Sequence, residues 1–238
     1  MANAVNGLIY GDNGYSGAEL AQIAQSMYGT PGEPLESISE EQLAFLLDYL
    51  VPSNYSLRYH TLKGGAPYAL SVPNRDYTKA VMHRPWQRQM LDDDYPRIAI
   101  MKARQLGLTE VGVAKMIHWA DVHSYAGVTC VYAFPTLTQL NSFTQMRLDT
   151  VLGRGYYNEI QDPDINSQRL KKIRNSYINF VTSSSNKTIE GVAGDYFSLD
   201  EFDRVPVTAY LSAQNALKSS RFKRMQLWST PKILLWAL

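Results

Sequence analysis

From residue 84 onward, short apolar runs alternate with segments of helical periodicity, and this alternation constrains the fold more than any other feature of the sequence. The apolar runs are "RIAIM" (97–101), "GVTCVYAF" (127–134), "SYINFVTS" (176–183), "DYFSLDE" (195–201) and "RMQLWST" (224–230). Apolar positions recur at helical spacing between them, at Val113, Met116, Ile117 and Ala120 and again at Leu137, Leu140, Leu148 and Val151. Strands that alternate with helices predict an α/β fold, with a mostly parallel sheet flanked by helices.

The segment before this core has a different pattern. Ser16 with Glu19, and Ser39 with Gln42, have the spacing of capping boxes, and each pair precedes apolar residues on one helix face. We therefore predict a small helical N-terminal subdomain and connecting segment over residues 1–80, and the core over 81–238. Residues 52–80 are expected to be connecting structure with one short strand.

Composition excludes several classes of protein. The chain of 238 residues has a formal charge of +1, so a nucleic-acid surface has to be a local patch. Its single cysteine, Cys130, rules out an internal disulfide framework and lies in an apolar run, where a buried packing role is expected. No apolar stretch approaches the about 20 residues that span a membrane, and the N-terminus lacks a signal-peptide pattern. We expect a soluble intracellular protein.

The stretch "AIMKARQLGLTEVGV" (99–113) resembles a phosphate-binding loop with a displaced lysine. In the pattern G-x-x-x-x-G-K-[ST] a lysine precedes the Ser/Thr, but here Leu108 takes that place and Lys102 stands where the first glycine is expected. A strand–loop–helix directs backbone N–H groups and the helix dipole toward an anion. Gly107 permits close backbone approach, the Thr109 hydroxyl suits Mg²⁺, and Lys102 or Arg104 is the candidate phosphate clamp. Alone, this match also fits a chance strand–loop–helix.

Two further strand ends carry polar residues that suit the same chemistry. Asp200 and Glu201 follow an apolar strand, so they are expected at the carboxyl edge of the sheet, where Asp200 holds Mg²⁺ and Glu201 deprotonates the attacking water. The alternative is an acidic helix N-terminus. Ser229 and Thr230 end another strand and are candidates for coupling hydrolysis to movement, although Ser-Thr-Pro is also an ordinary strand exit. In order, the three motifs predict a P-loop NTPase of the RecA-like type, with a strand inserted between the phosphate loop and the acidic strand.

The ordered set resembles the large terminase subunit of tailed phages, the ATPase that pumps DNA into procapsids. It comprises "KARQLGLTE", "VYAFPTLTQLNSFTQMRL", "FVTSSSNKTIEGVAGDYFSLDEFDRVP" and "WSTP", over about residues 84–232. In one branch of that family the lysine of the loop, the Walker A motif, is displaced to its front, as Lys102 is here. The resemblance implies ATP and Mg²⁺ as cofactors, double-stranded DNA as partner, a homo-oligomeric ring, and a small terminase subunit and portal protein. It also implies the cytoplasm of an infected host, with transient docking on the procapsid.

The resemblance assigns further residues. Gln87 falls where an adenine-contacting glutamine precedes the loop, although it also suits a solvated helix face. Arg147 matches an Arg-Leu position and is the candidate arginine finger acting on a neighbouring subunit, with a solvated helix face as the alternative. The predicted ATP-binding loop consists of Lys102, Ala103, Arg104, Gln105, Leu106, Gly107, Leu108 and Thr109.

Basic clusters and the end of the chain complete the predictions. Two clusters, at 168–176 and 221–226, are candidates for contact with DNA phosphates. The first contains Arg169, Lys171, Lys172 and Arg174, and it also has the pattern of a hairpin with its turn at Arg174-Asn175-Ser176. The nuclease domain typical of the family does not follow "STPKILLWAL", so we expect no nuclease activity from this chain, and the core is either complete or truncated at its C-terminal end.

Two other functions fit the same sequence. One is a helicase-like P-loop ATPase, which should unwind forked duplex and carry a second motor domain. The other is a module that binds nucleotide or DNA, or serves in assembly, without significant turnover.

Overall fold

The structure, a computed structural model, describes residues 15–62, 64–66, 68, 72–73, 80–81, 85–103, 106–184 and 187–230. Its main element is a seven-stranded sheet of order β3-β9-β8-β4-β7-β6-β5. The strands in that order are Arg97–Met101, Arg224–Ser229, Tyr196–Leu199, Thr129–Phe134, Ser176–Thr182, Leu170–Ile173 and Gln161–Asn166. The first five strands in that order, β3, β9, β8, β4 and β7, pair in parallel. The strands β6 and β5 extend the sheet by antiparallel pairing. The predicted α/β class with a mostly parallel sheet is confirmed.

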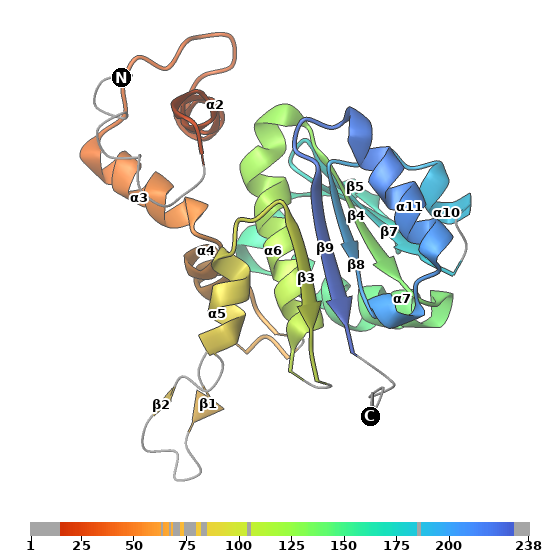
Figure 1. Ribbon diagram of the computed structural model, residues 1–238. Helices are drawn as coiled ribbons and strands as arrows, with labels where there is room; N and C mark the ends of the chain where they lie inside the picture. Colours follow the sequence, from red (N-terminus) through yellow and green to blue (C-terminus); the bar gives the residue numbers. More distant parts are fainter. Residues whose placement is uncertain are drawn as a thin grey trace.

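Helices cover both faces of the sheet (Figure 1). On one face lie α5 (Pro85–Asp92) and α6 (Leu108–Val122), and on the other lie α10 (Lys187–Glu190) and α11 (Val207–Ala216). The helix α6 is buried along nearly its whole length, because the sheet packs against one of its sides and the N-terminal helices against another. Between β4 and β5 the chain forms α7 (Leu137–Phe143), the π-helical turn η2 (Thr144–Leu148), α8 (Asp149–Leu152) and α9 (Gly155–Ile160).

The N-terminal region is helical, as predicted. Both capping boxes form, at Ser16 before α2 (Gly17–Tyr28) and at Ser39 before α3 (Glu40–Leu50). These helices share one hydrophobic cluster with α6, so they extend the core of the sheet. The division into two domains remains a prediction.

Residues 52–80 contain more structure than the sequence suggested. The helix α4 (Pro52–Tyr59) begins at a proline, which suits the first helical turn because its missing N–H has no partner there. A two-stranded hairpin of β1 (Val72–Pro73) and β2 (Ala80–Val81) follows. The prediction of connecting structure was therefore wrong for α4.

The hairpin β6–β7 settles the local structure of the first basic cluster. These strands pair antiparallel around a turn at Arg174-Asn175, and Arg174 has a φ of 49°. The hairpin that the sequence allowed is thus confirmed, and the cluster lies on it.

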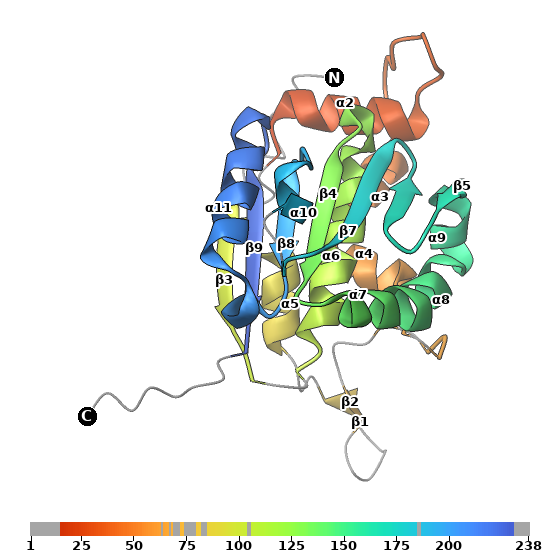
Figure 2. The same ribbon diagram turned by 90° about the vertical axis from the view of Figure 1, so that its right-hand side faces the viewer.

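The strand order decides which loops meet. The strand β9 lies between β3, which leads into the lysine-bearing loop, and β8, which leads into Asp200. This confirms the predicted insertion of one strand between the two. Because β3, β9, β8 and β4 are parallel, their carboxyl ends share one edge, the lower end of the sheet in Figure 1. Figure 2 shows α7 and the start of α6 at the same end.

Candidate active site

The loop between β3 and α6 ends in an uncapped helix N-terminus. Gly107 precedes α6 with a φ of 73°, a left-handed conformation that is costly for residues with a Cβ, and no described side chain caps the helix. The first N–H groups of a helix have no intrahelical partners and carry the positive end of its dipole. This end of α6 therefore offers donors to an anion, as predicted.

Asp200 lies directly after β8 and is only 4% exposed. Its carboxylate accepts hydrogen bonds from the Thr109 hydroxyl (2.9 Å), the Tyr132 hydroxyl (3.3 Å) and the Glu201 N–H (2.9 Å). The Lys102 ammonium is 4.0 Å from its Oδ1. The structure thus brings together three residues that the sequence had selected from two separate motifs, Lys102, Thr109 and Asp200.

Burial controls the electrostatics of this carboxylate. Loss of hydration raises the pKa of Asp200 above its usual range, and the Lys102 ammonium and the Thr109 hydroxyl act in the opposite direction. Additional positive charge beside Asp200 would therefore be favourable.

The residues present fit Mg²⁺. Thr109 and Asp200 supply a hydroxyl and a carboxylate oxygen 2.9 Å apart, which are the hard oxygen donors that this ion prefers. Among the described residues, no group of three His, Cys, Asp or Glu side chains forms a metal cage. Mg²⁺ is commonly held by one or two protein oxygens together with substrate phosphates and water, so this small donor set suits it.

Glu201 follows in an unusual backbone conformation. Its φ is 46° and its ψ 51°, a left-handed conformation that is uncommon outside glycine. Its carboxylate Oε2 is 2.8 Å from a guanidinium nitrogen of Arg204 and accepts a hydrogen bond of 3.3 Å from the Gln139 side chain. The acidic pair is thus not the start of an ordinary α-helix, which was the alternative interpretation.

Two adjoining clefts open beside these residues. The larger has a volume of about 650 Å³ and is lined by cationic, acidic and hydroxyl groups, among them Lys102, Arg204 and Thr230. The other, of about 540 Å³, extends toward Phe134 and Met146. Both are within the range of small-ligand and cofactor sites, about 300 to 1,000 Å³. Both clefts are lined by Thr109, Gln139, Arg147 and Glu201.

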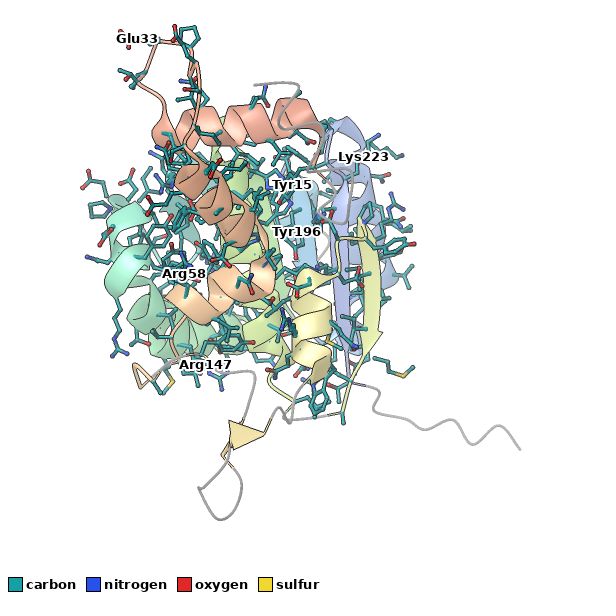
Figure 3. All side chains as sticks on the ribbon, turned by 90° about the vertical axis from the view of Figure 1, so that its left-hand side faces the viewer. Tyr15, Glu33, Arg58, Arg147, Tyr196 and Lys223 are labelled. Atoms are coloured by element: carbon teal, nitrogen blue, oxygen red, sulfur yellow. The ribbon has the colours of Figure 1, made fainter. Side chains whose placement is uncertain are left out.

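Arg147 lies in the π-helical turn η2, a rare form that often occurs at functional sites. Its side chain is 53% exposed, and its guanidinium is 3.9 Å from Glu110 Oε2. Figure 3 labels Arg147 at the end of the molecule to which the strands point. The residue lines the clefts of its own chain, and its predicted action on a neighbouring subunit remains a prediction.

The sequence analysis did not identify the residues behind Arg147. Glu110 follows Thr109 in the sequence. Its Oε1 lies 2.9 Å from Nε2 of the buried His60 imidazole, which follows the end of α4. The other ring nitrogen of His60 lies 3.3 Å from the Tyr157 hydroxyl. This contact joins residues fifty positions apart, and no spacing rule indicates it.

The end of β9 connects the loop to the acidic turn. The Ser229 carbonyl accepts a hydrogen bond from the Lys102 N–H (2.8 Å). Its hydroxyl accepts one from the Asp203 N–H (3.1 Å) and donates to Asp203 Oδ1 (3.4 Å). Ser229 and Thr230 therefore lie at the predicted edge, and their part in coupling remains a prediction. Asp203, which the sequence analysis had not selected, is the partner of Ser229.

Gln87 lies under the loop. It is 2% exposed, and its amide donates a hydrogen bond of 2.7 Å to the Leu106 carbonyl. The solvated-helix alternative is therefore wrong, because Gln87 supports the loop backbone from α5. Its predicted contact with adenine remains a prediction.

The remaining loop residues divide into two groups. The Leu108 side chain is 1% exposed and belongs to a hydrophobic cluster with Trp228, so the residue at the usual lysine position packs in the core. Ala103 is exposed, and Arg104 and Gln105 lie outside the described residues. The choice between Lys102 and Arg104 as the main phosphate clamp stays open.

The first basic cluster is engaged within the chain. Lys171 is 1% exposed and contacts Asp149 and Asn166, so its ammonium is not available to DNA phosphates, contrary to our prediction. Lys172 pairs with Asp162 at 2.9 Å, and Arg174 with the buried Asp121 at 2.7 Å. These pairs favour the structural interpretation for the three residues. Arg169 is exposed on the same hairpin, and DNA contact remains a prediction for it.

Fold and site together define an α/β chain with a candidate phosphate-binding loop, an acidic strand end and a polar strand end on one sheet edge. No protein-family model and no curated protein matches the sequence. Among solved structures, the chain is similar to the ATPase domain of the large terminase of Thermus phage P74-26. The TM-score is 0.46 and the identity 18%, over 69% of this chain and 72% of that one. A mutant of that domain, in which an arginine is replaced by alanine, gives the same values. None of the described helices is long and apolar enough to span a membrane.

Proposed function

We propose that this chain is a terminase-type ATPase motor domain, which hydrolyses ATP with Mg²⁺ to drive double-stranded DNA into a procapsid. One observation carries the ATPase part of the proposal, namely the hydrogen bond of 2.9 Å between the Thr109 hydroxyl and the buried Asp200 carboxylate. It joins the helix start of the phosphate-binding loop to the acidic strand, with the Lys102 ammonium 4.0 Å from the same carboxylate. The ordered motifs of the sequence support the assignment to packaging.

Each group has a role in this chemistry. The N-terminal N–H groups of α6 and the Lys102 ammonium bind the phosphates, and Arg104 is the second candidate clamp. Thr109 and Asp200 would hold Mg²⁺, which would supply positive charge to neutralise the charge that develops on the phosphates. Glu201 accepts a proton from water as the water oxygen bonds to the γ-phosphorus and the bond to the ADP oxygen breaks.

The setting of the motor is proposed from the same motifs. Subunits form a homo-oligomeric ring in the cytoplasm of the infected host, with DNA, a small terminase subunit and a portal protein as partners. Arg147 completes the charge stabilisation, and Ser229 with Thr230 transmits the hydrolysis state to the DNA-moving parts.

The test measures phosphate release and nucleotide binding by the full chain, with and without duplex DNA. Glu201→Ala should abolish most DNA-stimulated hydrolysis, since a general base contributes about 10²- to 10⁴-fold. Lys102→Ala should weaken ATP binding, whereas Lys218→Ala, an exposed lysine on the 3-10 turn η4 (Leu217–Ser219), should behave as wild type. Unchanged hydrolysis by Glu201→Ala would refute the proposal.

Two outcomes would favour the other functions. Unwinding of a forked duplex would indicate a helicase. A binding module would be indicated by two results together. The wild type would bind nucleotide without hydrolysing it at any DNA concentration, and Lys102→Ala would weaken that binding.

A further inference from the structure

The turn after β8 places an arginine over the proposed general base. Glu201 has left-handed backbone angles, and the next three residues form a single 3-10 turn, η3 (Phe202–Arg204). The Arg204 N–H donates to the Glu201 carbonyl at 2.8 Å. This hydrogen bond closes the turn, so Glu201 and Arg204 lie close together at its two ends. The resulting ion pair has a nitrogen–oxygen distance of 2.8 Å.

A second donor reaches the same carboxylate oxygen from another element. Gln139 lies in the first turn of α7 and donates to Glu201 Oε2 at 3.3 Å. Its own orientation is fixed, because its carbonyl oxygen accepts a hydrogen bond of 3.0 Å from the Thr136 hydroxyl, which caps α7. Both described donors to the Glu201 side chain therefore act on Oε2, and neither acts on Oε1.

The turn is also anchored from behind. Asp203, between Phe202 and Arg204, is hydrogen-bonded through its N–H and its carboxylate to the Ser229 hydroxyl at the end of β9. Arg204 is thus attached to a segment that is fixed to two strands of the sheet.

We propose that Arg204, together with Gln139, is a positioning residue for Glu201: it holds Oε2 so that Oε1 is the atom that receives the proton of the attacking water. The proposal rests on the ATPase function proposed above. Arg204 and Glu201 line the same cleft as Lys102 and Thr109, which places the pair beside the expected phosphates. A general base works only within hydrogen-bond reach of its proton, so fixing one carboxylate oxygen has a direct kinetic consequence.

Two other roles would give the same static geometry. Arg204 is 34% exposed, so it would also be compatible with an ordinary surface ion pair, a kind that contributes little. It would also be compatible with a clamp that leaves Glu201 and binds phosphate directly. The three roles predict different kinetics.

The experiment uses the full chain with duplex DNA and measures kcat, KM and the affinity for a fluorescent ATP analogue. Arg204→Gln should lower kcat about 10- to 100-fold, which is the scale of a base displaced by about 1 Å, and leave nucleotide affinity within about twofold of wild type. Arg204→Lys should recover part of kcat, because a cation is restored without the forked geometry. In combination with Glu201→Ala, Arg204→Gln should cause no further loss.

Arg58→Gln is the matched control. Arg58 is 45% exposed and forms an ion pair of 2.6 Å with Asp48. Figure 3 labels it on the N-terminal helices. Its variant should keep wild-type kcat, and both arginine variants should melt near the wild-type temperature, since each loses an exposed pair.

Each remaining result would overturn the proposal. An unchanged kcat in Arg204→Gln would mean a surface ion pair. A large loss of nucleotide affinity with an unchanged kcat at saturation would mean a phosphate clamp. An additional loss in the double variant would show that Arg204 acts independently of Glu201. If Glu201→Ala itself hydrolyses ATP at the wild-type rate, Glu201 is not the general base and the role of Arg204 is lost with it. Absence of hydrolysis by the wild type would instead refute the ATPase function.

Discussion

Two buried histidines should make the fold sensitive to mild acid. His118 lies on α6 beneath the N-terminal helices, where its Nε2 is 3.1 Å from the Tyr49 carbonyl oxygen. His123 follows α6, stacks on Trp119 with 4.3 Å between ring centroids, and has its Nδ1 2.9 Å from the Trp119 carbonyl oxygen. Burial lowers the pKa of each imidazole from 6.5 to about 3, so both are neutral in the folded protein near pH 6.

The size of the effect follows from proton linkage. Below about pH 6.5 the unfolded chain protonates these histidines, whereas the folded chain does not until about pH 3. Because the unfolded state binds more protons in this window, stability falls as the pH falls. Each histidine contributes a slope of about 1.36 kcal/mol per pH unit, so the pair contributes about 2.7 kcal/mol per unit. For a typical stability of about 5 to 15 kcal/mol, two to three pH units remove a large part of the total.

Asp200 acts in the opposite direction. Its pKa is raised in the fold, so the folded chain keeps a proton that the unfolded chain has lost, and this contribution favours folding as the pH falls. For this reason the test compares how the free energy of unfolding changes with pH in the wild type and in a variant that lacks both histidines.

Urea unfolding, followed by tryptophan fluorescence, should be measured between pH 7 and 4.5 for wild type and for the double variant His118→Gln, His123→Gln. Glutamine keeps an N–H donor for each carbonyl and does not titrate. The difference between the two slopes should approach about 2.7 kcal/mol per pH unit below pH 5.5, and each single variant should remove about half of it. Equal slopes in the wild type and the double variant would refute the assignment of neutral buried imidazoles.

Three further substitutions test other parts of the structure. Gln226→Met should raise the free energy of unfolding by about 1 to 3 kcal/mol, because both polar side-chain atoms of Gln226 are buried without a described partner. Lower stability in urea unfolding would contradict this. Gly107→Ala should cost about 1 to 2 kcal/mol of stability and weaken ATP binding, because the residue has a positive φ of 73°. A variant as stable as wild type would show that the loop adapts. Gln87→Leu should raise the Kd for ATP severalfold through loss of the Leu106 contact, and an unchanged nucleotide titration would separate Gln87 from the site.

The parts of the fold that the sequence predicted are those that local chemistry determines. Both capping boxes formed, because a Ser and a Glu or Gln three residues later satisfy each other within one helical turn. The five parallel strands of the sheet were predicted from their apolar runs, whereas β5 was not, because its sequence "QDPDIN" is largely polar. The helix α4 was missed because "PSNYSLRY" has little apolar periodicity, and its buried residues, Ser53, Tyr55 and Ser56, include two serines.

The site was predicted as far as it depends on strand ends. Lys102 and Asp200 directly follow a parallel strand and Ser229 is the last residue of one, so their common edge could be inferred from order alone. Glu110 and His60 meet across the boundary between α4 and α6, where the pairing depends on tertiary packing. The burial of Lys171 was missed for a similar reason, because only its contact with Asp149 on α8 shows that the charge is directed inward.

The alternation of side chains along β3 explains why the Lys102 side chain, at the front of the loop, points toward Asp200. Side chains alternate across a strand, and Met101, the last residue of β3, is 76% exposed. The Lys102 N–H continues the ladder by donating to the Ser229 carbonyl, so its side chain takes the opposite direction. The Lys102 side chain is 10% exposed, and its ammonium is 4.0 Å from Asp200 Oδ1. Leu108, at the position where the usual pattern has lysine, is the first residue of α6 and packs in the core with Trp228. The ladder with β9 therefore fixes the direction of the Lys102 side chain, and the same Ser229 also holds the turn of Arg204 through Asp203.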